Sequence, residues 1–546
     1  MYFKKFKQRL GQQLGFNPLA WIRSGLRVEA MLDQWLGGAA APRPAADART
    51  IAVLVTPWLA TVVPWYSIVV GVLLAARGAR VVYVFDDLPF SNAPKRALLI
   101  RATIRRVLRR FAGPGEVLVL SRFLGAPGAP VDGAALIERM AALNAVHALR
   151  GEMVADGRAG YVALVRRQLQ RADPAIQALL AGHRFDVLFI PGGIYGTTGL
   201  WLDRAKRAGV RVASYDAGGY GTVLFAADGI AAQLQDVPRA FARLKDTVAS
   251  EREHALILRV ARGELDKRHQ GKDAFGSQMV ATSAGPLEKY RGAILLALNS
   301  SWDQAALGLH AVFETNTEWI VETARWVVEH TDATIVIRQH PSERLAVAST
   351  SDDYAALLRH HFGGHERVLF VHAADPVNTY ELLTVVSTVV AYTSTIGVEA
   401  AALGNRVIVP SRSYYAGLGF VWSAAARAAY FSLIRQSVAG ELVLTTQMRQ
   451  DAMYCYYVTQ ICNWIFSPFS PESFELWSRE SIAGLNADPT VGVLLEALAH
   501  DIPAALFNHR GRLAAEPVEG GGAAAADAAD EPAEPAEPAA AAVGAP

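Results

Sequence analysis

The stretch that decides the fold reads Ala391-Tyr-Thr-Ser-Thr-Ile-Gly-Val-Glu-Ala-Ala-Ala-Leu-Gly-Asn-Arg-Val-Ile-Val-Pro410. Its pattern predicts a short strand, a polar turn at Thr393, Ser394 and Thr395, a helix that carries Glu399, and a second buried strand. Backbone N–H groups at a helix N-terminus favour the binding of a phosphate. We therefore expect the turn to bind a phosphate and Glu399 to accept hydrogen bonds from ribose or sugar hydroxyls.

Helix capping is the alternative explanation of these residues, because Ser and Thr are common N-caps. In a capping box the acidic residue stands three positions after the cap. Glu399 stands four positions after Thr395 and five after Ser394. The spacing therefore favours ligand binding over capping.

A second polar strand end lies upstream, in Ile335-Val-Ile-Arg-Gln-His-Pro-Ser-Glu343. Pro341 ends the predicted strand, which leaves His340 at its mouth beside Arg338 and Glu343. A histidine there can donate to a phosphate oxygen or transfer a proton. We take His340 and Glu343 as catalytic candidates and Arg338 as a donor-binding candidate. Glu343 has the alternative of a simple ion pair with a neighbouring arginine.

Three further loops follow predicted strands. Asn299-Ser-Ser-Trp-Asp303 is either a substrate loop, which makes Asp303 a third catalytic candidate, or a turn with an Asx hydrogen bond. In the N-terminal half, Gly192, Gly193 and Asp216 are candidates for the acceptor side of the site. Their glycines let a backbone approach a ligand, or merely turn tightly.

Runs of Val, Ile and Leu alternate with helical segments along most of the chain, which is typical of parallel sheets covered on both faces. The pattern predicts an α/β protein of GT-B type, with two Rossmann-like domains facing a ligand cleft at the carboxyl ends of their strands. The expected divisions are a basic segment 1–48, an N-terminal acceptor domain 49–284, a C-terminal donor domain 285–505 with closing helices, and a disordered Ala/Pro/Glu tail 506–546. Strands are expected at 51–56, 81–85, 117–120, 187–190 and 210–214, then at 293–298, 334–337, 368–371, 388–392 and 406–409, with helices that include 132–180, 315–330 and 447–500.

Charge is unevenly distributed. Residues 514–546 hold seven acidic residues and no Lys or Arg, so the rest of the chain has 53 basic against 44 acidic residues, a net charge of +9. A basic body suits anionic partners such as nucleotides or lipid headgroups; we expect no nucleic acid as a partner. Cys455 and Cys462 are too few for a disulfide framework and indicate a reducing compartment.

Two basic segments, 2–16 and 95–111, have apolar residues at helical spacing. Each is explained either by an ordinary surface helix or by contact with an anionic membrane. The uncharged stretch 51–76 has the length of a membrane span, but Pro57 and Pro64 favour a strand, a loop and a helix instead. We expect a cytoplasmic protein that contacts the inner face of the membrane peripherally.

A set of motifs runs in order through residues 293–418: Trp302-Asp303, Ile337-Arg-Gln-His-Pro-Ser-Glu343, Asp375-Pro376, Tyr380-Glu-Leu382, Thr393-Ser-Thr-Ile-Gly-Val-Glu-Ala400, Gly404-Asn-Arg-Val-Ile-Val409 and Tyr414-Tyr415. With these motifs the segment resembles the bacterial capsule polysaccharide biosynthesis family. The resemblance implies a glycosyltransferase of the type that transfers 3-deoxy-manno-octulosonate, with a distant similarity to the glycerophosphotransferases of teichoic acid synthesis. It also implies that His340, Ser394, Thr395 and Glu399 hold the donor nucleotide and its phosphate, supported by Asp303 and Glu343.

These observations predict a transferase that uses a nucleotide-sugar and a glycan or lipid-linked acceptor, with no further cofactor. No metal is expected, since His360, His361 and His365 have no Cys or acid at ligand spacing. A glycerophosphate or polyol-phosphate transferase, a sugar-nucleotide epimerase and a non-catalytic binding protein on the same fold are the alternatives. The sugar, the acceptor, the general base and the stereochemical outcome stay open.

Overall fold

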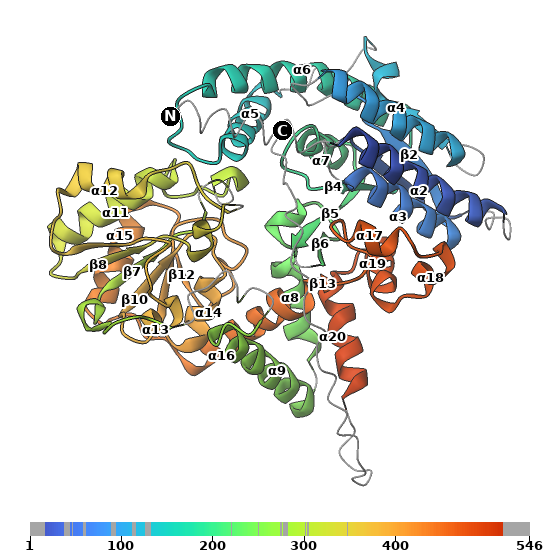
Figure 1. Ribbon diagram of the computed structural model, residues 1–546. Helices are drawn as coiled ribbons and strands as arrows, with labels where there is room; N and C mark the ends of the chain where they lie inside the picture. Colours follow the sequence, from blue (N-terminus) through green and yellow to red (C-terminus); the bar gives the residue numbers. More distant parts are fainter. Residues whose placement is uncertain are drawn as a thin grey trace, which may run out of the picture.

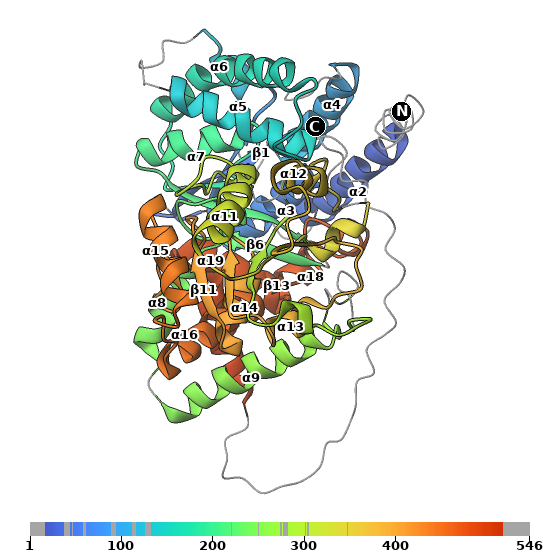
Figure 2. The same ribbon diagram turned by 90° about the vertical axis from the view of Figure 1, so that its left-hand side faces the viewer.

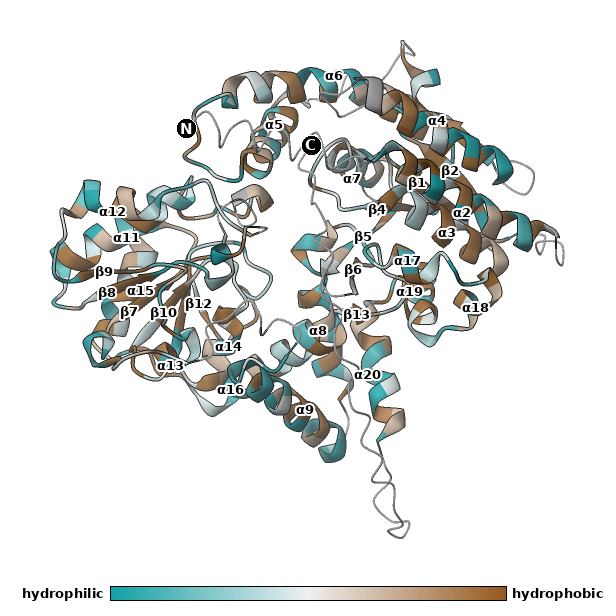
Figure 3. Ribbon diagram, in the orientation of Figure 1, coloured by the Kyte–Doolittle hydropathy of each residue, from teal (hydrophilic) through white to brown (hydrophobic). Residues whose placement is uncertain are grey.

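The computed structural model describes residues 17–37, 44–45, 47–57, 62–88, 94–111, 116–125, 133–219, 221–248, 250–273, 276, 282–300, 302, 305–346 and 348–516. They form two α/β domains, each built on its own sheet (Figure 1). The predicted fold class is thereby confirmed. Figure 3 shows the reason: apolar residues fill the strands of both sheets, while polar residues gather on the helices around them.

The first sheet has the strand order β13-β6-β5-β4-β1-β2-β3, parallel except at β6 and β13. Its central strands are buried on both faces, as their continuous Val, Ile and Leu content predicts. Helices α2, α3 and α4 pack on one face, and α5, α6 and α7 on the other. The strands are β1 (Thr50–Val55), β2 (Arg80–Phe85), β3 (Glu116–Val119), β4 (Val187–Pro191), β5 (Arg211–Gly219), β6 (Thr222–Ala226) and β13 (Ile465–Phe466), and the helices are α2 (Pro18–Gly37), α3 (Val63–Ala76), α4 (Pro94–Phe111), α5 (Ala134–Leu149), α6 (Arg158–Gly182) and α7 (Thr198–Arg207).

The second sheet, β12-β11-β10-β7-β8-β9, is parallel throughout. Helices α11, α12 and α15 cover one face, and α8, α9, α14 and α16 cover the other. Thr315 caps α11 through its side chain, at the predicted helix start. The strands are β7 (Ile294–Ala297), β8 (Ile335–Arg338), β9 (Val368–Val371), β10 (Thr388–Ala391), β11 (Arg406–Val409) and β12 (Trp422–Ser423), and the helices are α8 (Val237–Thr247), α9 (Glu251–His269), α11 (Asn316–His330), α12 (Tyr354–Phe362), α13 (Thr379–Leu383), α14 (Ile396–Leu403), α15 (Arg427–Val438) and α16 (Thr446–Tyr456).

The uncharged stretch 51–76 contains strand β1 and helix α3, with Pro57 after the strand, so the predicted strand and helix are confirmed. Pro64 stands in the first turn of α3, where its missing N–H costs no hydrogen bond. Strand β2 then pairs in parallel with β1, which completes the βαβ unit. No helix in the part of the chain that the structure describes is long and apolar enough to cross a membrane.

The two cores divide the chain differently from the expected boundaries. Helices α8 and α9 pack in the core of the second sheet, although 49–284 was expected to form the first domain. Figures 1 and 2 both place α9 beside α16 at the lower edge of the molecule. Residues 465–498 instead return to the first domain, where β13 pairs with β6 and three helices join its core. These helices are α17 (Phe474–Trp477), α18 (Ile482–Ala487) and α19 (Pro489–His500).

Two other predicted segments differ from the structure. The expected long helix at 132–180 is two helices, α5 and α6, because Arg150 adopts the left-handed conformation (φ 58°) and ends α5. The tail begins later than residue 506, since α20 (Ala504–Ala515) packs against the cysteine-bearing segment after α16. Both cysteines are buried as unpaired thiols. Residues 517–546 of the expected tail lie outside the described residues.

Of the two basic segments, the structure describes only the second, which forms helix α4; residues 2–16 lie outside the described residues. Its apolar side, including Ile100, Ile104 and Val107, is buried against the first sheet. On its outer side Arg105 pairs with Asp87, and Arg106 Nε lies 2.7 Å from a carboxylate oxygen of Glu29. Most apolar residues of α4 therefore serve the core, while its arginine side and Leu98, which is 63 % exposed, face outward.

Candidate functional site

A cavity of about 440 Å³ lies between the two domains. The second domain contributes the carboxyl ends of β7, β8 and β10 and the start of α14, and the first domain contributes the end of β5 and the short 3₁₀ turn η2 (Ala232–Leu234). This is where parallel α/β sheets place ligands. Seven of the candidate residues line this cleft: Asp216, Arg338, His340, Thr393, Ser394, Thr395 and Glu399.

The opening stretch folds as β10, a turn, α14 and β11, as predicted. Thr395 stands at the N-cap position, but its side chain makes no capping hydrogen bond. The Thr393 N–H donates to the Asn299 side chain over 3.4 Å, so this amide of the expected phosphate cradle already has a partner. Gly397 lets the turn approach Tyr415, since an added Cβ would lie 2.4 Å from the Tyr415 hydroxyl.

Glu399 is 1 % exposed, and its carboxylate reaches the cleft from the first turn of α14. The Tyr380 hydroxyl donates to Oε2 over 2.7 Å. Oε1 lies 3.8 Å from Nη1 of Arg268 and has no hydrogen-bond partner. Burial raises the pKa of Glu399, and the charge of Arg268 and the side-chain hydroxyls of Tyr380 and Thr395 oppose that rise. One buried carboxylate oxygen, Oε1, therefore lies at the cleft with room for a hydrogen bond from a ligand.

Arg268, near the end of α9, is a site residue that the sequence reasoning missed. Its guanidinium contacts Glu399, pairs with Asp273 and donates from Nη2 to Gln460 over 3.3 Å. It follows no strand and belongs to no recognisable motif, and the expected domain boundary placed it in the other half of the protein. Only the packing of α9 under the second sheet brings this cation to the cleft.

His340 lies at the mouth of β8, as predicted. Its Nδ1 lies 2.6 Å from the Ser342 hydroxyl and accepts from the Ser342 N–H over 3.3 Å. Burial, with the charges of Arg338 and Arg268, lowers the pKa of His340 to about 4, so the ring is neutral at neutral pH. Because Nδ1 accepts a hydrogen bond, the ring proton is assigned to Nε2, and His340 is a neutral donor.

Arg338, expected to bind the donor, lines the cleft and is held by hydrogen bonds within the chain. It is 1 % exposed, and its guanidinium donates to the carbonyls of His372 (2.5 Å) and Val377 (3.0 Å). Burial lowers its pKa to about 10, which leaves it cationic at neutral pH. Arg338 therefore holds the loop after β9 in place and adds positive charge behind His340.

Glu343 does not lie in the cleft. Its side chain is buried, accepts from Gln339 Nε2 over 2.5 Å, and faces a separate cavity of about 350 Å³ that Asp352 also lines. Burial raises the pKa of Glu343 to about 7. The 3₁₀ turn after Pro341 directs this side chain away from His340, so the two expected catalytic partners are separated. Asp303 lies outside the described residues.

Gly192 and Gly193 also lie away from the cleft lining. Both have positive φ angles (65° and 115°), and the Gly192 N–H donates to the Tyr215 carbonyl over 2.7 Å. The tight turn after β4 accounts for both glycines. Of the three acceptor-side candidates, Asp216 alone lines the cleft.

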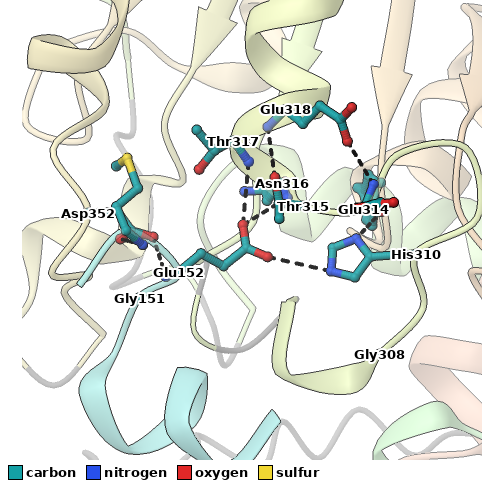
Figure 4. A network of polar contacts seen from close by, with 12 residues as sticks. Gly151, Glu152, Gly308, His310, Glu314, Thr315, Asn316, Thr317, Glu318 and Asp352 are labelled. Carbon is teal, nitrogen blue, oxygen red and sulfur yellow. Dashed lines mark hydrogen bonds and ion pairs between the residues drawn. The ribbon is translucent and has the colours of Figure 1, made fainter. Parts of the chain in front are cut away.

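A second polar cluster joins the domains away from the cleft, and we call residues 150–153 with their contacts the interdomain latch (Figure 4). Glu152, from the loop after α5, accepts from the Asn316 and Thr317 N–H groups at the start of α11, over 2.8 and 3.4 Å. Asp352 accepts in turn from the N–H groups of Glu152 and Met153, over 3.0 and 2.8 Å. The first domain thus caps a helix of the second.

Comparisons with known proteins bear on the second domain. The model of the family described as capsule polysaccharide biosynthesis protein matches residues 263–460. No curated protein matches the chain closely enough in sequence to serve as a relative.

Solved structures that are similar include two transferases from Thermosulfurimonas dismutans KpsC. The beta Kdo 2,4 transferase is 14 % identical, covers 50 % of this chain and 79 % of its own, and has a TM-score of 0.34; for the beta Kdo 2,7 transferase the values are 16 %, 51 %, 79 % and 0.31. A putative UDP-N-acetylglucosamine 2-epimerase from Listeria monocytogenes is 13 % identical over 74 % of this chain and 90 % of its own, with a TM-score of 0.25. These TM-scores are too low to support an argument about the fold. The fold assignment therefore rests on the two sheets of this chain and on the cleft between them.

The matched residues 263–460 begin just before Arg268 and extend through His340 and Glu399 to Gln460, so they contain the whole second-domain side of the cleft. The resemblance predicted from the motifs of residues 293–418 is confirmed, because the model of the capsule polysaccharide biosynthesis family matches this part of the chain.

Proposed function

We propose that the protein is a glycosyltransferase of surface polysaccharide assembly that takes its sugar from a nucleotide-activated donor. The observation that carries the proposal is the buried carboxylate of Glu399 in the cleft wall, whose Oε1 has no geometric hydrogen-bond partner and lies 3.8 Å from the cation of Arg268. A buried polar atom left in this state is costly unless a ligand completes it. A ribose or sugar hydroxyl supplies the missing donor, and the adjacent positive charge suits the phosphates of the same ligand.

The donor would bind against the second domain. His340 would donate from Nε2 to a phosphate oxygen, while Arg268 and the turn at Ser394 and Thr395 oppose the charge that develops on the leaving nucleotide. Fixed donors of this kind stabilise the leaving group without reorganising during the reaction. In the transfer, an acceptor oxygen bonds to the anomeric carbon, the bond from that carbon to the phosphate oxygen breaks, and the nucleotide leaves with the electron pair. The acceptor hydroxyl releases its proton, and no further cofactor takes part.

The acceptor, a glycan or a lipid-linked saccharide, would enter from the first domain. We also propose a cytoplasmic location with peripheral contact to an anionic membrane, through the arginine side of α4 and through residues 2–16. Arg105, Arg106 and Arg109 face outward on α4, which supports the proposal. Binding to vesicles of phosphatidylglycerol should fall with salt and with alanine at Arg109, and binding that ignores both would contradict the contact.

A donor panel tests the activity. The full chain is incubated with CMP-, UDP- and GDP-activated sugars and lysate-derived glycans, and nucleotide release and calorimetric nucleotide binding are measured together. We expect release from one donor class and its loss in His340→Ala and Glu399→Ala. Tight nucleotide binding with intact donor would indicate a non-catalytic binding protein. CDP-glycerol and CDP-ribitol are added to the panel, and release of CMP from them, with transfer of glycerophosphate or polyol phosphate to the acceptor, would indicate the other transferase class. The absence of any nucleotide binding would overturn the proposal.

A further inference from the structure

The first-domain wall of the cleft differs in chemistry from the second-domain wall. Its lining residues are Asp216, Ala217, Gly218, Leu224, Gln233, Leu234, Gln235 and Trp464, and none of these described residues is a cation. The second-domain wall brings Arg268 and Arg338 to the same cavity. A ligand that bridges the cleft therefore meets positive charge on one side and amide and carboxylate oxygens on the other.

The amide of Gln233 has a fixed orientation. Its Nε2 donates to Oδ2 of Asp216, across the turn between β5 and η2. The carbonyl oxygen of the same amide must then point the other way, and this Oε1 is buried without a hydrogen-bond partner. Asp216 itself accepts from the Ala217 N–H over 2.8 Å. Gln233 thus presents a hydrogen-bond acceptor, and its donor is already used.

Gln235 also has a buried amide oxygen without a hydrogen-bond partner, and its backbone is strained. It is one of three non-glycine residues with positive φ among the described residues, at φ 58° and ψ 127°. A long side chain in this region of conformational space is unfavourable, and such outliers gather where a ligand site requires a given side chain. The sequence could have placed glycine here at no conformational cost, yet it carries a glutamine that lines the cleft.

We propose that this wall binds the acceptor and that the acceptor is a neutral, hydroxyl-rich saccharide. Amide oxygens accept hydrogen bonds from sugar hydroxyls, and both unfilled oxygens belong to uncharged side chains. A phosphate or carboxylate placed there would face the carboxylate of Asp216 and two acceptor oxygens, with no cation among the described residues of this wall to balance its charge. The inference rests on the proposed transfer and adds the substrate class of its second substrate.

Matched saccharide pairs test the inference on the full chain. Methyl galactoside and methyl galacturonide differ by a carboxylate at carbon 6, and methyl glucoside and methyl glucuronide form a second such pair. Binding is measured by saturation-transfer NMR in the presence of the nucleotide that binds in the donor panel. We expect at least one neutral member to bind tenfold or more tightly than its acidic partner. Equal or tighter binding of the acidic members, or no binding of any member, would overturn the inference.

Variants locate the binding. Gln233→Leu and Gln235→Ala should each weaken the neutral saccharide at least fivefold and leave the nucleotide dissociation constant unchanged. Gln235→Gly separates binding from folding, because it removes the side chain and also relieves the positive φ, so its thermal midpoint should not fall while saccharide binding does. Gln177→Ala is the matched control, since Gln177 on α6 also has a buried Oε1 without a hydrogen-bond partner but lies outside the cleft.

The two proposals fail in different ways. If nucleotide binds and the Gln233 and Gln235 variants leave saccharide binding unchanged, the acceptor wall is wrong and the donor site stands. If no nucleotide binds, the proposed function fails, and the acceptor assignment fails with it.

Discussion

Two glutamates, Glu399 and Glu152, show how the same side chain serves different ends in this protein. Both side chains are largely shielded from solvent, at 2 % exposure for Glu399 and 9 % for Glu152, and both lie near the start of a helix. Glu152 reaches from the first domain to α11 of the second, and two backbone N–H groups and the ring of His310 surround its oxygens. Glu399 stays within its own domain, where one oxygen accepts from Tyr380 and the other lies in the cleft without a hydrogen-bond partner.

The difference teaches how to separate a structural carboxylate from a ligand-binding one. A carboxylate whose oxygens are satisfied by fixed backbone donors has no capacity left for a ligand, and it stabilises the fold. A shielded carboxylate that keeps an unused oxygen in a cavity is costly unless a ligand fills it. Burial alone therefore does not distinguish the two roles, whereas the count of hydrogen bonds does.

Removing Arg268 should have the largest effect. In Arg268→Ala the buried carboxylate of Glu399 loses its nearby cation, and breaking a buried pair costs about 3–5 kcal/mol of stability. Thermal and urea unfolding measure the loss, with Arg268→Lys as the variant that keeps the charge. If Arg268→Ala unfolds as the wild type does, the charge of Arg268 does not stabilise the Glu399 carboxylate. Glu399 would then differ from Glu152 in its hydrogen bonds alone.

Removing the charge of Glu399 should have the next largest effect, on ligand binding. Glu399→Gln should weaken nucleotide binding about 10- to 100-fold, because hydrogen bonds to charged groups contribute roughly 1.5–3 kcal/mol. Isothermal titration calorimetry gives the dissociation constant, and Glu152→Gln is the matched control on the other glutamate. If both variants lost nucleotide affinity equally, Glu399 would not be a ligand-binding residue in a sense that Glu152 is not.

Glu343 sharpens the comparison through pH. Burial raises its pKa in the folded state to about 7, above the ordinary value of 4.5, so the folded protein binds a proton that the unfolded chain releases between these values. Its contribution to stability is therefore complete below pH 4.5 and is lost as the pH rises through 7. Glu343→Gln, which stays neutral, should match the wild type at pH 4.5 and exceed it at pH 8, by on the order of 2–3 kcal/mol. The same difference in thermal midpoint between variant and wild type at both pH values would contradict this prediction.

Breaking the interdomain latch should have the smallest effect. Glu152→Ala leaves the buried Asn316 N–H without its acceptor and should cost about 1–2 kcal/mol. Because the apolar contacts of α8, α9 and α16 remain on the other side, the domains should stay folded, with a wider distribution of interdomain distances in spin-label measurements. Nucleotide affinity should stay within twofold of the wild type. A loss as large as that of Glu399→Gln would place Glu152 in the ligand site.

Much of the fold follows from local pattern. Strands such as β9 and β11 match their predicted bounds, because a short run of Val and Ile between turns has few other ways to be buried. The short strands β12 and β13 were missed, since two-residue strands leave no periodic signal. The break between α5 and α6 was also missed, because the left-handed Arg150 is stabilised by residues of the other domain: its carbonyl accepts from the Ser351 N–H over 2.7 Å.

The sequence by itself determined that two parallel sheets form, and that Thr393, Ser394, Thr395, Glu399 and His340 stand at strand ends or helix starts on one edge. Those positions depend on periodicities of two and 3.6 residues, which neighbouring residues set. The tertiary structure alone decided that Arg268 joins Glu399, that Glu343 turns away from His340, and that Glu152 caps a helix of the other domain. Each of these depends on how helices and turns pack over long sequence separations, and local pattern carries no record of that packing.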